Sequence, residues 1–593
     1  MSKNFVLIIY LLCTVALAAQ PDTLTIGFGE YHGVMVSASS SHNYPPETTL
    51  KQDGYLPNLN ASSRFLGQAT LGYNMEDLQE VSEMGIEDWI DSQFVKPIPF
   101  SLKNKVKDYH NFVKTATNTP AAGQIYRMWS YAWWQYHMAS ADVLRQRVAM
   151  ALSELFVVSD KSAFGGNSYA LSSYYDVMLN NAFTNYRDLM EDVTFHPAMG
   201  VYLTFLNNPK SNPATNQFPD ENYARELMQL FTIGTSKLNM DGSYVLGTNG
   251  QPIQTYNNTD IAEFAKVFTG LSWADRTTFN RSAANDTSYT LPMIMFNSSH
   301  ETGVKNLLNG FVVPNRVPTD GIADIQDAIS NLFNHSNTPP FVAKFLIQRL
   351  VTSNPSPDYI ERVANVFVNN GQGVRGDMKA IIKAILLDPE AKSCKSGNDV
   401  EYGALREPFV RYVQINKAFD ASTASGNYRN DMDYVYRFVQ QKPLTSPSVF
   451  NFFQQEYQPI GPIEEADLVG PEFQITNAQT IMGYVNSLYR FVIQENVADE
   501  YDLYTNEDDA TYANEVSTID LNDEVLLTDN NKLHILLDRL NLLLAQGRLT
   551  ASSLAIIKNV VTELPNGTAT EKRDRVRLAI YLIMSSPEYL INR

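Results

Sequence analysis

The sequence predicts a mainly α, multi-helix globular fold with one small β-hairpin insertion near residues 238–258. Two observations indicate helices: apolar residues recur at helical spacing in several long segments, and residues 219–234 carry both start and stop signals. The third observation is a pair of turn dipeptides, Asp241-Gly242 and Asn249-Gly250, between alternating residues, which is typical of a hairpin. We therefore expect helices throughout, interrupted by one short stretch of strands.

The first residues have the pattern of a secretory signal peptide, which we place at residues 1–19. Lys3 precedes an apolar run, and Ala16 and Ala18 supply small residues before a cleavage point. The run is too short for a typical transmembrane span, and no later stretch approaches the necessary length of about 20 apolar residues. We expect a protein that is soluble after signal removal and secreted or periplasmic, with an irregular leader over residues 20–61.

Helical periodicity begins near residue 62, and we expect one mainly helical domain over residues 62–593. Over residues 141–158, Leu144 and Val148 belong to a core-facing stripe, whereas Arg145, Arg147 and Glu154 fall on other faces. The other expected helices cover residues 85–94, 128–137, 174–193, 219–234, 323–334, 340–352, 357–369, 377–387 and 577–584. A hairpin and long loop insertion covers residues 238–320, and residues 495–530 form an acidic loop or linker.

Composition narrows the class of function. The chain has 593 residues, of which 44% are hydrophobic, so it can bury a large core. One of its two cysteines, Cys13, lies in the predicted signal peptide, so no disulfide is expected within the mature chain. The net charge of −19 argues against a nucleic-acid partner, because such binding depends on clustered Lys and Arg. The common motifs of serine hydrolases, zinc proteases and nucleotide-binding proteins are absent from the sequence.

The predicted helix over residues 219–234 has an unusual charged face. Pro219 suits the first helical turn, and Gly234 suits the position just beyond the last turn. At about 100° per residue, one arc is apolar. The other arc holds two acids, an arginine and two amides, namely Glu221, Asn222, Arg225, Glu226 and Gln229. Such a face is typical of a polar functional site, and it is equally typical of a solvated helix surface.

Glu221 and Glu226 are the candidates for acid and base in catalysis, with Arg225 positioning them or binding an anionic group. Such a pair works when its surroundings push the two pKa values apart, and glycoside hydrolysis uses a pair of this kind. A structural explanation stays open, because Glu221 and Arg225 lie four residues apart, as do Asn222 and Glu226. Ion pairs and hydrogen bonds along the helix surface would then explain the charges.

Four further residues are candidates for binding. Asp220 and Asn222 belong to the first turn of the same helix. His196 precedes a proline at a helix end, where a histidine commonly serves as a C-terminal cation or cap, and His300 lies in the long loop. Together, His300, Glu301, Glu221, Glu226 and Asp260 could assemble a metal centre of histidine and carboxylate ligands. The spacings match no zinc or iron signature, so we expect no cofactor and leave a divalent metal open.

Several segments together resemble one bacterial family, known as "domain of unknown function 1800". The matching segments cover residues 145–154, 196–200, 219–234, 268–271, 338–343, 350–355, 373–377, 406–408 and 448–453. They follow one another in order across nearly the whole mature chain. Members of the family look exported, and they are often encoded beside a sulfatase-like family, "domain of unknown function 1501". The resemblance therefore implies export and a sulfatase-like partner protein, but no catalytic residue.

Two functional hypotheses follow from these observations. The first is a carboxylate-dependent hydrolase that acts on an extracellular polymer. The second is a non-catalytic surface or periplasmic protein that binds or assembles with the sulfatase-like partner. A deep cleft that holds Glu221 and Glu226 would favour the first, whereas an exposed apolar patch, with the glutamates ion-paired, would favour the second.

Overall fold

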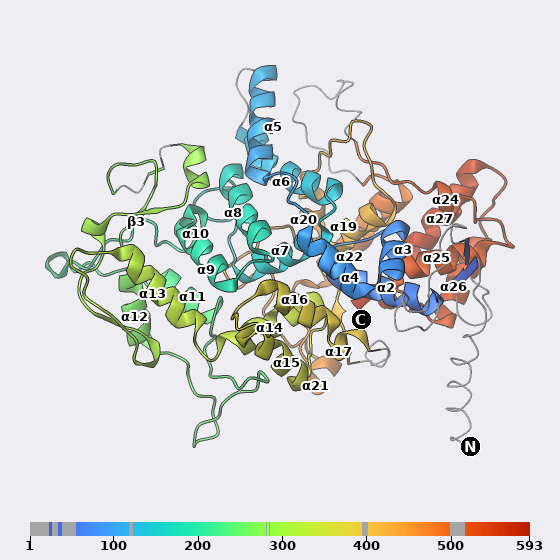
Figure 1. Cartoon of the computed structure of the whole chain (residues 1–593). Helices are drawn as coiled ribbons and strands as arrows, with labels where there is room; N and C mark the ends of the chain where they lie inside the picture. Colours follow the sequence, from blue (N-terminus) through green and yellow to red (C-terminus); the bar gives the residue numbers. More distant parts are fainter. Residues whose placement is uncertain are drawn as a thin grey trace.

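Helices dominate the computed structural model, which describes residues 23–26, 34–37, 55–117, 122–279, 282–283, 285–393, 401–497 and 516–593 (Figure 1). Within these ranges the strands form only two-stranded sheets, so the predicted mainly α fold is confirmed. The predicted signal peptide, Cys394 and residues 498–515 of the predicted acidic loop lie outside the described residues. No helix in the described ranges has the length and apolar character needed to cross a membrane.

The two ends of the chain pack together. The N-terminal elements are β1 (Thr23–Ile26), β2 (Val34–Ser37), α2 (Tyr55–Ala69), α3 (Met75–Met84) and α4 (Ile86–Val95). The C-terminal elements are α24 (Asn522–Val525), α25 (Leu533–Ala545), α26 (Ala551–Thr562), α27 (Ala569–Met584), α28 (Pro587–Leu590) and β8 (Ile591–Asn592). Ser63 Oγ donates to Leu542 O at 2.7 Å, and Asn592 Nδ2 donates to Gly67 O at 3.1 Å. Figure 1 shows these blue and red helices side by side.

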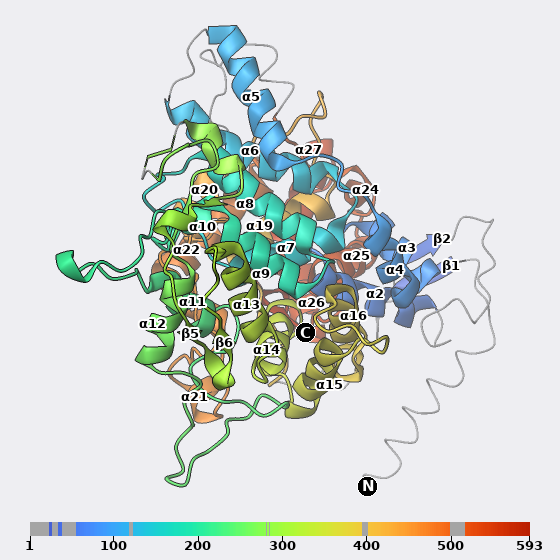
Figure 2. The same ribbon diagram turned by 60° about the vertical axis from the view of Figure 1, so that its left-hand side comes forward.

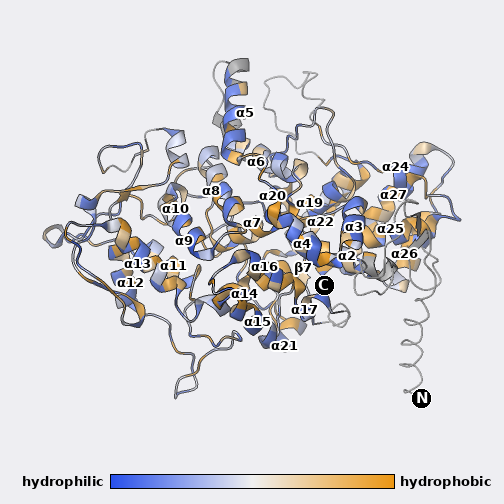
Figure 3. Cartoon of the chain, viewed as in Figure 1, coloured by the Kyte–Doolittle hydropathy of each residue, from blue (hydrophilic) through white to orange (hydrophobic). Residues whose placement is uncertain are grey.

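The centre of the molecule is built from helices of the first half of the chain, most of them buried. They are α5 (Leu102–Thr117), α6 (Ala122–Ala139), α7 (Val143–Leu155), α8 (Ser168–Asn181), α9 (Tyr186–Phe195) and α10 (Pro197–Tyr202). Trp133 and Trp134 of α6 are fully buried, so their large aromatic side chains belong to the core. Helix α7 is buried along almost its whole length, including its charged residues. By contrast, α5 projects from the body and is coloured mainly as hydrophilic in Figure 3.

A second layer covers α7 and α9. It contains α13 (Gly321–Phe333), α14 (Thr338–Leu350), α15 (Pro357–Val368), α16 (Met378–Leu387) and α17 (Pro389–Lys392). Helix α14 packs against α7, and α13 packs against α9, an arrangement that Figure 2 shows from the side. The remaining elements are β7 (Ala404–Leu405), α19 (Pro408–Ala418), α20 (Asp433–Val439), α21 (Pro462–Glu465), η8 (Pro471–Ile475), α22 (Ala478–Leu488) and a π-helical turn (Tyr489–Ile493).

Order begins earlier along the chain than the sequence predicts. Helix α2 starts at Tyr55, seven residues before residue 62, and β1 pairs antiparallel with β2 inside the segment expected to be irregular. The leader therefore contains regular structure.

The small β insertion near residues 238–258 is confirmed, with a geometry of its own. Three extended stretches between residues 235 and 255 are joined by isolated antiparallel bridges, such as Leu238 with Tyr244 and Leu246 with Pro252. Gly242 and Gly250 have φ values of +80° and +74°, which glycine adopts at little steric cost. This segment, green in Figure 1, projects from the body, and its base lies beside α14.

The helix predicted over residues 219–234 is shorter than expected. It forms α11 (Asn222–Gln229), followed later by α12 (Asn258–Val267). Asp220 stays outside the helix because its carboxylate accepts the Asn222 N–H at 2.8 Å and the Thr204 hydroxyl at 2.9 Å. At the other end, the N–H groups of Ile233 and Gly234 both donate to Met228 O at 3.0 Å, which closes a wide final turn.

The long loop insertion is fastened to α13 by a buried carboxylate. The loop carries β3 (Leu271–Ser272), η5 (Asp286–Thr290), β4 (Ile294–Met295), β5 (Lys305–Asn306) and β6 (Val312–Val313). Asp324 of α13 accepts hydrogen bonds from Lys305 Nζ at 2.6 Å, from His300 Nε2 at 3.1 Å and from Arg316. Burial acts to raise the pKa of Asp324, but the hydrogen bonds from His300 and Lys305 outweigh burial, so the pKa is lowered.

We predict that Asp324→Asn lowers the free energy of unfolding at pH 7 by about 3–5 kcal/mol, because Lys305 then stays buried without a carboxylate. Because the folded-state pKa is lowered, the contribution of Asp324 is present above the unfolded-state pKa and is lost as the pH falls through the folded value. Urea unfolding measures both effects. Asp327→Asn is the control, since Asp327 lies on the same helix, is partly exposed and should change stability by about 1 kcal/mol or less. Equal losses in both variants would contradict the prediction.

Candidate functional site

The two candidate glutamates of α11 lie in different environments. Glu221 is half-exposed and pairs with Arg225 at 3.1 Å. Glu226 is buried, and its Oε2 has no hydrogen-bond partner among the described residues. Burial raises the pKa of Glu226. Five positions along a helix correspond to a rotation of about 140°, so the two carboxyl groups point to different sides of α11. The structure therefore does not bring them together across one substrate bond, and their catalytic roles stay predictions.

Asp220 and Asn222, predicted to bind a ligand, serve the local fold in this structure. Both contact the turn at Thr204. The Thr204 hydroxyl donates a hydrogen bond to Asp220 Oδ2 at 2.9 Å, and Asn222 Nδ2 donates to Thr204 Oγ1 at 3.4 Å. Thr204 has a φ of +63°, a strained value for a β-branched residue. These hydrogen bonds hold the chain in position before α11.

The two candidate histidines lie in separate places. His196 lies at the C-terminus of α9, as expected, but its side chain caps the N-terminus of α10, where Nδ1 accepts the Ala198 N–H at 3.2 Å. Burial lowers the pKa of His196 to about 3, so the ring is neutral and serves as an acceptor. His300 lies in the Asp324 network, with Nδ1 at 2.8 Å from Thr269 O.

The metal centre considered from the sequence is not assembled. Glu301 accepts the Ser211 N–H at 2.7 Å, and Asp260 accepts the Asn257 N–H at 2.8 Å in a capping box. In the described part of the chain, no group of three or more His, Cys, Asp or Glu side chains is placed to hold a metal ion. Glu301 and Asp260 each accept a hydrogen bond from a backbone N–H group instead.

A cavity of about 400 Å³ lies where five parts of the chain meet. Its walls come from the end of α7, the end of α11, the base of the 235–255 segment, α14 and the loop 449–456. Among the described lining residues two are acids, Glu154 and Glu456. Glu456 lies on the loop and pairs with Lys344 of α14 at 2.7 Å, whereas Glu154 is buried at the end of α7. The volume falls within the range of about 300–1,000 Å³ that is usual for ligand sites.

Glu154 belongs to a buried ionic group that we call the glutamate–arginine cluster. Its members are Glu154, Glu407, Glu472, Arg147 and Arg349. All five side chains are at least nine-tenths buried. Arg349 Nη1 lies 3.7 Å from Glu154 Oε2 and 3.8 Å from Glu472 Oε1, and Arg147 Nη1 lies 3.8 Å from Glu407 Oε1. Gln441 Nε2 donates to Glu407, and Arg147 Nη2 donates to the Arg349 carbonyl. Three acids thus share two arginines in the interior.

The cluster favours protonated carboxyl groups. Burial raises the pKa of Glu154 well above its ordinary value, and the neighbouring Glu407 raises it further through charge and hydrogen bonding. Burial likewise raises the pKa of Glu472, to about 7, although Arg349 opposes the shift. The raised pKa values therefore favour a protonated carboxyl group in the cluster, next to the cavity.

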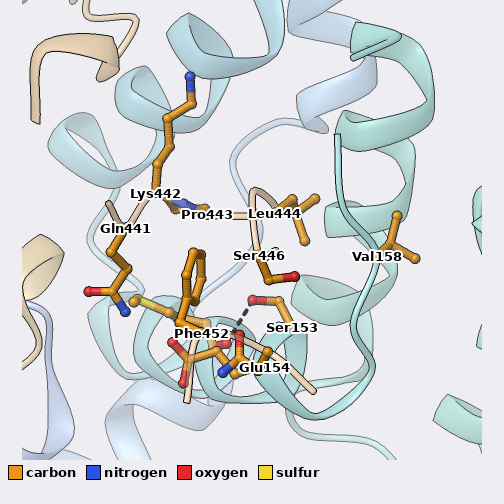
Figure 4. A pocket seen from close by; sticks show the side chains of 11 residues that line it. Ser153, Glu154, Val158, Gln441, Lys442, Pro443, Leu444, Ser446 and Phe452 are labelled. Carbon is orange, nitrogen blue, oxygen red and sulfur yellow. Dashed lines mark hydrogen bonds between the residues drawn. The ribbon is translucent and has the colours of Figure 1, made fainter. Parts of the chain in front are cut away.

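A second, much smaller hollow lies on the other side of Glu154. It has a volume of about 10 Å³, room for roughly one water molecule. Figure 4 shows Glu154 below the ring of Phe452, with Gln441 to one side and Ser446 above, while Lys442 points away. The carboxyl group of Glu154 thus lies between the large cavity and a site for one water.

Comparison with known proteins places the chain in a family. Residues 64–591 match the family model described as "Protein of unknown function (DUF1800)". The chain belongs to this family. No curated protein and no solved structure gives a significant match. Three segments by which the chain resembles DUF1800 proteins, residues 145–154, 406–408 and 448–453, supply Glu154, Glu407 and a cavity wall in this structure.

The glutamate–arginine cluster was missed by the interpretation of the sequence. Arg147 and Glu154 were placed on faces away from the core, yet both are buried. A signal was present, because several DUF1800-like segments carry an arginine or glutamate with no local partner of opposite charge. Charged residues inside apolar helices are almost never buried unless they are paired, so such segments point to partners elsewhere in the chain.

We predict that Glu226→Gln leaves the free energy of unfolding at pH 7 unchanged or higher, because an amide avoids the ionised form that burial disfavours. Since the folded-state pKa of Glu226 is raised, its contribution to stability is fully present below the unfolded-state pKa and is lost as the pH rises through the folded value. The free energy of unfolding of the wild type should therefore rise relative to that of the variant as the pH falls from 7 to 5. Glu221→Gln, which breaks a half-exposed ion pair, is the control with a change of about 1 kcal/mol or less. A loss of several kcal/mol in Glu226→Gln would show a structural partner instead.

Proposed function

We propose that this protein is an exported hydrolase that cleaves an extracellular polymer by carboxyl-group acid–base catalysis, with Glu154 as the general acid. The observation that carries the proposal is the position of Glu154, which lines the 400 Å³ cavity and has a pKa raised by burial and by Glu407. A general acid works best when its pKa is close to the pH at which the enzyme operates. An ordinary glutamate would be ionised at neutral pH and would have no proton to give.

The surroundings of Glu154 suit proton donation. Glu407 is held by Gln441 and Arg147, which fixes its carboxyl group against Glu154. Glu154 Oε1 is buried and has no hydrogen-bond partner among the described residues, and Glu154 is one of the residues that line the cavity. The raised pKa of Glu472 supplies a second group that can exchange a proton near neutral pH.

Glu456 is the candidate for the general base. It is the second acid of the cavity wall, and it is half-exposed, so water reaches its carboxylate. The ion pair with Lys344 at 2.7 Å holds the loop 449–456 to α14 and orients the carboxylate. One buried acid and one water-accessible carboxylate line a single cavity, and hydrolysis by two carboxyl groups uses two such environments.

The rest of the cavity wall supports binding of a ring-containing unit. Phenylalanines from two elements line it, Phe341 and Phe345 from α14 and Phe450 and Phe453 from the loop, and Tyr244 adds a ring from the 235–255 segment. Aromatic side chains offer large apolar surfaces on which sugar rings stack. An exported protein meets such units in extracellular polysaccharides.

A second candidate function is binding without catalysis. The projecting segment exposes Tyr244, Leu246 and Ile253, and the Glu221–Arg225 pair is satisfied without a ligand. An exposed apolar group of this kind is typical of a protein contact, and the sulfatase-like partner suggested by the family resemblance is the first to test. Sedimentation of the two proteins together, weakened by Leu246→Ser but not by Glu221→Gln, would favour this function.

We predict that Glu154→Gln lowers the rate of polymer hydrolysis by about 10²–10⁴-fold, because the amide has no proton to donate. In the wild type the rate should fall as the pH rises through the pKa of Glu154, since the acid form is then lost. The measurement is release of reducing ends from a panel of extracellular polysaccharides over a range of pH.

Glu221→Gln is the matched control and should keep full activity, because Glu221 lies outside the cavity wall. A folded Glu154→Gln variant with wild-type activity would exclude Glu154 as the acid. Absence of hydrolysis by the wild type on every polymer would favour the binding function.

A further inference from the structure

We infer that the cavity is an oxyanion-binding site and that Arg349 binds an anionic group on the substrate, a carboxylate or a sulfate ester. This inference rests on the proposed function for the identity of the substrate as a polymer, although binding itself requires no hydrolysis. The proposed substrate is then a polymer whose units carry negative charge. The geometry of Arg349, the charge around it and the shape of the wall support it independently.

Arg349 is buried but poorly hydrogen-bonded. It lies in α14, lines the cavity and is only 4% exposed. Its Nε and Nη1 atoms have no hydrogen-bond partner among the described residues. The nearest carboxylate oxygens, on Glu154 and Glu472, lie 3.7 and 3.8 Å from Nη1, beyond the 2.7–3.2 Å of an N–H···O hydrogen bond. A buried arginine without such bonds is costly, so a ligand that supplies them would be bound.

The neighbouring acids are weak counter-ions for Arg349. Burial raises the pKa of Glu154 well above its ordinary value and that of Glu472 to about 7, which favours the uncharged form of both carboxyl groups. The remaining acid of the cluster, Glu407, is engaged by Arg147 and Gln441. A guanidinium group keeps its charge in proteins. The cavity floor therefore carries positive charge that an oxyanion would neutralise.

Two aromatic rings fix the orientation of the guanidinium. Its central carbon lies 4.4 Å from the ring centre of Phe453 and 5.4 Å from that of Phe345. Rings that cover a guanidinium group leave its hydrogen-bonding edge as the polar part, and that edge matches a two-oxygen acceptor. A carboxylate or sulfate bound there would also lie near Glu154. Its negative charge would help to keep Glu154 protonated, in agreement with a role as acid.

The test is a titration of the protein with small ligands, in which NMR signals of the ligand report binding. The probes are glucuronate, glucose 6-sulfate and neutral glucose, which share a ring and differ in charge. We expect both anions, or one of them, to bind at least about tenfold more tightly than glucose, and the preferred anion identifies the source of the charge. Equal binding of glucose, or no binding of either anion, would overturn the inference without any variant.

A variant pair assigns the effect to Arg349. Arg349→Lys keeps one positive charge but loses the planar fork, so it should weaken anion binding about tenfold and leave glucose unchanged. Arg187→Gln removes an arginine that is partly exposed, pairs with Glu191 and lies outside the cavity wall, so this variant should bind anions as the wild type does. Unchanged anion binding in folded Arg349→Lys would overturn the assignment. These sugars contain no bond to hydrolyse, so anion binding without polymer hydrolysis would contradict only the proposed function.

Discussion

The requirement that buried charges find partners governs the centre of this protein. Glu154, Glu407, Glu472, Arg147 and Arg349 come from four segments that lie far apart in the sequence, and all are buried. An unpaired charge in the interior costs several kcal/mol, so these segments have to stay within a few ångströms of one another. The cluster thereby holds α7 against α14 and α19. Two of its residues, Glu154 and Arg349, also line the cavity and form its floor.

The cavity exists because the elements around that floor do not fill it. Helix α11 ends at Gln229, the chain leaves through the left-handed Gly234, and the 235–255 segment turns outward instead of packing inward. On the opposite side, the Lys344–Glu456 pair keeps the loop 449–456 at the rim. The same few elements therefore supply the proposed acid, the proposed base and the proposed anion-binding arginine.

The sequence predicted the helices well, because periodicity and capping are local properties. Turn glycines placed the β insertion near residues 238–258. The roles of individual polar residues were predicted poorly. His196 ends α9 as the sequence predicts, but its ring is a neutral acceptor that caps α10 and not a cation, and Glu226 was placed on a polar arc, whereas it is buried. Helical periodicity orients a side chain relative to its own helix, not relative to the neighbours that cover it.

The sequence by itself therefore determined the fold class, many of the helices, the net negative charge and the membership of the DUF1800 family. Only the tertiary structure decided which charged residues are buried together. Arg349 meets Glu154 across 195 residues of chain and Glu472 across 123, and no local pattern encodes such a contact. The pKa of a carboxyl group depends on the dielectric and the charges that surround it, and those are set by packing between distant segments. For this reason the candidate site moved from the exposed face of α11 to the buried end of α7.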